Sequence, residues 1–116
     1  MYFDFGSRRL FVCVGPVDMR CGAERLSQMV VTKMELSPLD NSAFLFTGKR
    51  RNMIKILVWD RNGFWLFTKH LYKGTYAWPK DEESVKKQVT AEAVAALLEG
   101  QDRWRRLEDT KGRELQ

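Results

Sequence analysis

The sequence predicts a single α+β domain over residues 1–100, in which two helices cover the apolar face of a twisted antiparallel β-meander of about four or five strands. Three apolar segments, 42–47, 53–60 and 64–71, follow one another with turn-forming residues between them. Apolar residues at helical spacing precede and follow this region. A length of 116 residues and a hydrophobic fraction of 44% suit one domain with one core.

The first part of the chain predicts a strand followed by a helix. Residues 8–14 form a short apolar segment that ends at Gly15-Pro16. Asp18 is a suitable N-cap for a helix through about Thr32, with Gly22 inside it at a cost of roughly 1 kcal/mol relative to Ala. The expected apolar face of this helix consists of Met19, Ala23, Leu26, Met29 and Val30.

The meander has two possible registers at its second hairpin. A two-residue Asn62-Gly63 turn is a strong hairpin signal, because both residues tolerate positive φ. It groups Lys55, Leu57 and Trp59 on one face with Leu66, Thr68 and His70. A three-residue turn from Arg61 with a bulge groups the same three residues with Trp65, Phe67 and Lys69. The sequence leaves both registers open.

The last third predicts further elements around a second helix. Residues 76–79 suit an edge strand, because Pro79 cannot donate to a ladder. Residues 85–89 form an extended segment, and Thr90 is expected to cap a helix that Gly100 closes. Residues 101–116 form a charged C-terminal tail, either helical or frayed.

Positive charge is concentrated in the middle of the chain. Residues 47–80 contain eight Lys or Arg and one carboxylate, Asp60, so their formal charge of +7 exceeds the +5 of the whole chain. We expect these cations to share one exposed surface that binds a polyanion such as DNA. The alternative for the 49–51 cluster is a turn tip that only aids solubility. The predicted phosphate-binding residues are Lys49, Arg50, Arg51, Lys55, Arg61, Lys69 and Lys73.

Arg20 is a weaker candidate for the same role. A cation at the start of a helix opposes the helix dipole, which points to an ion pair or a bound anion. Aromatic side chains could add base stacking, and Tyr72, Tyr76 and Trp78 are the best placed because they lie outside the two most apolar strands. The alternative is that these rings belong to the core.

The sequence argues against catalysis and cofactors. Cys13, Cys21 and the distant His70 cannot supply the four ligands of a structural zinc site, and the cysteines suit small buried side chains. The carboxylates show no spacing that would hold metal ions for phosphoryl chemistry. The first ten residues lack the pattern of a secretory signal, and no apolar run approaches the roughly 20 residues that span a bilayer. We therefore expect a cytoplasmic, non-enzymatic protein without metal or cofactor.

The ordered motifs of the chain resemble a known family. They are Gly15-Pro-Val-Asp-Met-Arg-Cys-Gly22, the block from Ile54 to Asp60, the block from Asn62 to Phe67, and Leu97-Leu-Glu-Gly100. This combination resembles the TnpB-type accessory protein encoded beside the transposase in bacterial insertion sequences of the IS66 family. One departure is His70, which stands where that family usually has Arg. The resemblance implies a role in transposition beside a separate transposase that carries out the chemistry. We expect a non-catalytic accessory protein that binds DNA at the insertion-sequence ends, the element's transposase, or both; the alternative is a protein–protein adaptor of the transposition complex with no direct DNA contact.

Overall fold

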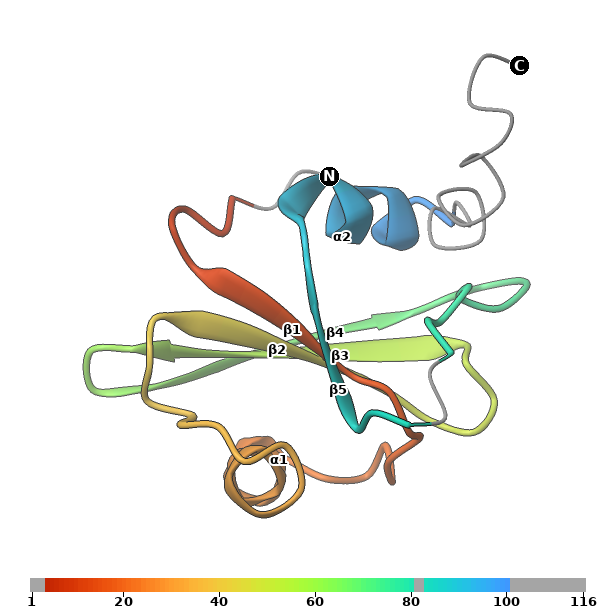
Figure 1. Ribbon diagram of the computed structural model, residues 1–116. Helices are drawn as coiled ribbons and strands as arrows, with labels where there is room; N and C mark the ends of the chain where they lie inside the picture. The colour runs from red at the N-terminus through yellow and green to blue at the C-terminus, as the bar shows by residue number, and fades with distance from the viewer. Residues whose placement is uncertain (1–3, 81–82, 101–116) are drawn as a thin grey trace.

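A five-stranded sheet with one helix on each side forms the protein (Figure 1). The computed structural model describes residues 4–80 and 83–100. The strand order across the sheet is β4-β3-β2-β1-β5. The predicted α+β class with a strand meander is confirmed. The elements are β1 (Arg9–Cys13), α1 (Ala23–Thr32), β2 (Ser42–Thr47), β3 (Met53–Asp60), β4 (Gly63–His70), β5 (Lys86–Val89) and α2 (Ala91–Leu98).

The sheet is mixed, whereas the sequence predicted antiparallel pairing. Strands β2, β3 and β4 form the predicted antiparallel meander, and β5 pairs antiparallel with β1. However, β1 and β2 are parallel, with Phe11 opposite Phe44. The reason is the connection between them: α1 carries the chain back along the sheet before β2 begins, which is how parallel neighbours are joined.

The two helices cover opposite faces of the sheet, as Figure 1 shows. The expectation that both helices cover one apolar face was wrong. All six residues of β2 are buried, so apolar side chains point to both faces, and each face needs its own cover. On the α1 face, Leu26 and Val30 pack among residues such as Phe44. On the α2 face, Val94 and Leu97 pack with residues such as Leu45.

Helix α1 begins later than predicted, because Asp18 is used elsewhere. The Asp18 carboxylate accepts a hydrogen bond from the Arg20 amide at 2.9 Å and further bonds from the Arg20 guanidinium. The chain therefore makes a turn at these residues. Gly22 is the N-cap, in an extended conformation and with no side chain to cap the helix. The prediction that Gly22 lies inside the helix was therefore wrong. Cys13 and Cys21 are free and buried, as expected.

The β3–β4 hairpin resolves the open register. Asp60 pairs with Gly63, so the turn consists of Arg61 and Asn62, one residue earlier than the Asn-Gly signal suggested. Leu57 lies opposite Leu66, so Leu57 and Leu66 share one face of the sheet, as the two-residue-turn alternative predicted. This register packs the partly buried Phe64 and Leu66 against the α1 core, and such packing on one face is what fixes the register of a strand.

The segment after β4 supports the core without forming a strand. The edge strand predicted at 76–79 is absent from this described segment, because Tyr76 and Trp78 instead turn into the α2-side core. The Trp78 indole N–H donates to the Cys13 carbonyl at 2.9 Å. The extended segment at 85–89 is β5, which pairs with β1.

Helix α2 has the predicted ends. The Thr90 hydroxyl accepts from the Ala93 amide at 3.1 Å, and Gly100 has the positive φ of 85° expected of a closing glycine. The predicted tail, 101–116, lies outside the described residues. Within the described part of the chain, neither helix has the length and apolar character to cross a bilayer.

Candidate nucleic-acid interface

Two loops lie side by side at one end of the sheet, and together they bring cations from distant positions into one region. The Leu71 amide donates to the Asn52 carbonyl at 2.7 Å, and the Tyr76 amide donates to the Arg51 carbonyl at 2.6 Å. The β2–β3 turn and the loop after β4 are thereby fixed to each other, on the right of Figure 1. We call this region the basic end, and its cations are Lys49, Arg50, Arg51 and Lys73.

The cations of the basic end are available to a ligand. All four side chains are exposed. Within residues 4–80 and 83–100, none of the four forms an ion pair with a carboxylate. Arg51 adopts a positive φ of 55°, so the turn stays tight and the three consecutive cations project from its tip. Among the described residues, the basic end is therefore a compact group of positive charges without a paired carboxylate.

A close backbone approach holds the β2–β3 turn in place. The Val17 amide donates to the Thr47 carbonyl at 2.9 Å, which brings the 17–19 segment against the turn. A Cβ atom added to Gly48 would lie 2.8 Å from Cγ of Met19. Only glycine fits there without a shift of its neighbours, so the basic turn packs closely against the 17–19 segment.

The other three predicted cations lie outside the group at the basic end, so the single shared surface expected from the sequence was wrong. Two are near the same end of the sheet but on its opposite faces, and one is at the far end. Lys55 donates to the Cys21 carbonyl at 2.9 Å on the α1 face. Lys69 donates to the Leu98 carbonyl at 2.8 Å on the α2 face. Arg61 lies at the other end of β3, with its Nε 3.8 Å from a carboxylate oxygen of Asp60. Side chains alternate between faces along a strand, and this separates residues that are near in sequence.

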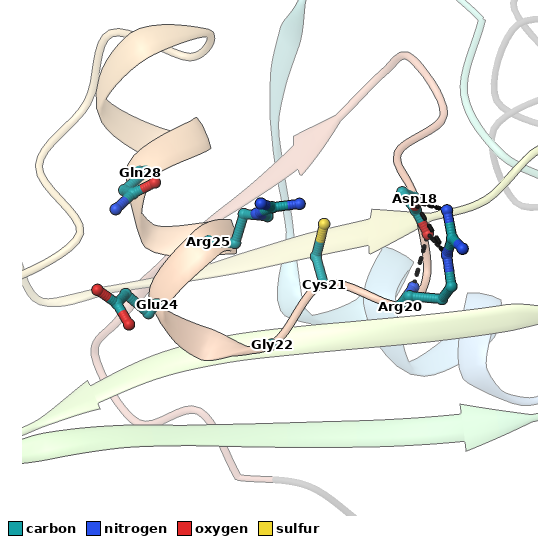
Figure 2. Close-up of a pocket in the computed structure, with 7 residues that line it drawn as sticks. All are labelled: Asp18, Arg20, Cys21, Gly22, Glu24, Arg25 and Gln28. Carbon is teal, nitrogen blue, oxygen red and sulfur yellow. Dashed lines mark hydrogen bonds and ion pairs between the residues drawn. The ribbon is translucent and has the colours of Figure 1, made fainter.

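Arg20 is held in an ion pair, as its position in the sequence suggested. Its Nη2 donates to Asp18 at 2.7 Å, at the edge of an open pocket of about 790 Å³ (Figure 2). The hydrogen bonds from Arg20 keep the pKa of Asp18 well below its ordinary value. The pair is therefore neutral overall, and Arg20 contributes little net charge to the basic end. The residues that line the pocket are Asp18, Arg20, Cys21, Gly22, Glu24, Arg25 and Gln28.

The three aromatic residues considered for base stacking divide into two classes. Tyr76 and Trp78 are only 1% and 5% exposed, so the prediction that they could stack on bases was wrong. Tyr72 is fully exposed, at 103% of its reference area. The sequence could not separate them, because all three lie in one stretch of polar and aromatic residues without periodicity.

The comparisons with known proteins agree with the motif resemblance. A family model described as IS66 Orf2 like protein matches residues 8–108. The chain belongs to this family. Among curated relatives of this IS66 family member, the uncharacterized protein y4hO of Sinorhizobium fredii is 34% identical over 102 residues, covering 88% of this chain and 87% of the relative. The uncharacterized protein y4jC of the same organism is 29% identical, covering 85% and 83%. No solved structure gives a significant match.

Proposed function

We propose that this IS66 family member is a non-catalytic accessory factor of transposition that binds element DNA through its basic end. Its membership of the family supports a transposition-associated role. The observation that carries the DNA-binding part is the grouping of Lys49, Arg50, Arg51 and Lys73 at the paired loops. In this proposal the separate transposase carries out the chemistry, and the accessory protein contributes affinity for DNA.

The physical argument rests on phosphate contacts. Exposed Lys and Arg side chains that neutralise phosphates release condensed counterions, so each contact strengthens binding and makes it sensitive to salt. Four contacts on duplex DNA give a slope of log affinity against log salt of about −3.6. Such contacts carry no sequence information of their own, so binding through the basic end alone should be weakly selective.

Salt-dependent binding tests this proposal directly. We expect the protein to bind a labelled duplex of an element end in fluorescence anisotropy, with a slope of roughly −3 to −4. The triple variant Lys49→Ala/Arg50→Ala/Arg51→Ala should reduce the magnitude of this slope by about 2.7. It should also lower the affinity for the duplex by about tenfold or more at low salt. Arg61→Ala, at the opposite end of the sheet, is the control and should change neither. An unchanged slope in the triple variant would refute the proposal.

A second candidate function is direct docking of the transposase on strand β4. This strand is an edge of the sheet, and residues 63–68 contain no charge or proline that would discourage pairing with another strand. Trp65 on this strand is 57% exposed, and large exposed aromatics are enriched at protein interfaces. An added strand from a partner would complete the backbone hydrogen bonds of this edge.

A pull-down with the cognate transposase, with and without nuclease, separates the two functions. Capture that survives nuclease treatment and is lost in Trp65→Ser favours docking on β4. Capture that disappears with nuclease favours a bridge through DNA. The triple variant at the basic end is the matched control, since it should leave a direct protein contact intact.

A further inference from the structure

Tyr72 is an aromatic ring held in solvent beside the cations of the basic end. Its neighbour Lys73 belongs to that cluster, and His70 precedes it at the end of β4. The ring is fully exposed, so no part of it is used to bury the core. Tyrosine normally covers apolar surface in a folded protein, and a ring that covers none is available for a ligand.

The loop that carries Tyr72 is anchored on both sides. Before it, the Leu71 amide is bonded to the Asn52 carbonyl. After it, the Tyr76 amide is bonded to the Arg51 carbonyl, and the Tyr76 and Trp78 rings are buried. Gly74, with a φ of 82°, allows the chain to turn within this short span. The ring is therefore presented from a fixed backbone, and binding would order only its side chain.

We propose that Tyr72 stacks on an unpaired base, so that the substrate of the basic end is DNA with single-stranded character. This inference rests on the proposed function, because the neighbouring cations supply the phosphate contacts. Aromatic rings stack on any exposed base face, and a positively charged groove with such rings is a common design for single-strand binding. In a B-form duplex the base faces are already stacked on each other, so the ring gains nothing there unless a step is opened.

The test compares three probes of one sequence: a single strand, the blunt duplex, and the duplex with a short single-stranded overhang. We expect Tyr72→Ala to weaken binding of the single strand and of the overhang probe by about tenfold or more, the range given by loss of one stacked base. Binding of the blunt duplex should change less than about twofold. Tyr72→Phe keeps the ring and should bind all three probes like the unmodified protein. Leu39→Ala removes another exposed apolar side chain, in the loop before β2 at the opposite end of that strand, and is the control that should leave binding of all three probes unchanged.

Each outcome decides the inference. Equal effects of Tyr72→Ala on single strand and duplex would overturn it, as would no effect on either. A loss in Tyr72→Phe as large as in Tyr72→Ala would also overturn it, because the hydroxyl and not the ring would then make the contact. If the triple variant still weakens duplex binding and reduces its salt dependence in those cases, the proposed function stands without the stacking. If none of the probes binds, both proposals fail.

Discussion

The two ends of the sheet both carry a hairpin turn with arginine, but their charge differs. At the β3–β4 turn, Asp60 lies beside Arg61 and also accepts a hydrogen bond from the Trp65 indole at 3.0 Å. At the basic end, the β2–β3 turn contains three cations and no acid, and a second loop adds Lys73. Cations counted along a sequence therefore overstate a binding surface. What matters is whether the fold leaves them grouped and unpaired.

The largest expected effect concerns the buried ring of Trp78, which anchors the loop after β4 in the core beside the basic end. Trp78→Ala removes a nearly buried ring and its hydrogen bond to Cys13, and we expect a loss of about 3–5 kcal/mol in the free energy of unfolding, measured by urea denaturation. Trp78→Phe keeps most of the packing and should lose less, about 1–2 kcal/mol. An Ala variant as stable as the unmodified protein would mean that the loop after β4 is not anchored in this way.

The next effect compares the two ends at equal change in net charge. Lys73→Glu and Arg61→Glu each change the protein by two charges. We expect the first to weaken duplex DNA binding by about tenfold and the second by less than about threefold, because only the first lies among unpaired cations. Anisotropy titrations at one fixed salt concentration measure both. Equal losses would show that net charge alone governs binding and that the two ends are equivalent.

A smaller effect separates the cations that hold the fold from those of the basic end. Lys69→Met keeps the aliphatic stem and removes the ammonium group that bonds to Leu98 near the end of α2. We expect a loss of about 0.5–1 kcal/mol in stability, since a cation there bonds an end carbonyl and complements the helix dipole. DNA affinity should stay within about twofold of the unmodified protein. A large loss of affinity with unchanged stability would instead make Lys69 a DNA contact.

The smallest effect concerns the Asp18–Arg20 pair. Arg20 lowers the pKa of Asp18 below its ordinary value of 3.8. The ion pair therefore stabilises the folded protein fully at a pH above 3.8, and this stabilisation is lost as the pH falls from there through the lowered pKa. We expect Asp18→Asn to lower the melting temperature slightly at pH 7, with a difference that shrinks in acid. The same variant frees the Arg20 guanidinium and should raise DNA affinity about twofold. Lower affinity in Asp18→Asn would show that the intact pair takes part in binding.

The meander and α2 could be predicted because local signals decide them. Alternating apolar segments, the Asn62-Gly63 signal and the Thr90 and Gly100 ends gave the right elements in the right order. The start of α1 could not be predicted, because the side chain of Asp18 had two competing uses, a helix cap and a turn bonded to Arg20. The parallel β1–β2 pair was also missed, since strand direction depends on the path of the chain across the sheet.

Only part of the candidate site could be predicted, because some of its residues are grouped by local sequence and others by long-range contacts. Adjacent cations at 49–51 remain together under any register, so their grouping is a property of the sequence. The positions of Lys55 and Lys69 depend on the hairpin register, which packing of Phe64 and Leu66 decides. The approach of Lys73 to this turn depends on two long-range backbone hydrogen bonds. No local pattern encodes such bonds.

The pairing of β5 with β1 has a consequence for how the protein is made. One side of the domain is closed only when β5 and α2 join β1, a strand synthesised much earlier. A ribosome-bound chain that ends before β5 would show the apolar residues of β1 and β2 to the surroundings on that side. Contacts so distant in the chain form slowly, because a long loop must close first. The emerging protein is therefore most exposed to chaperones, and to premature association, until β5 and α2 have left the exit tunnel.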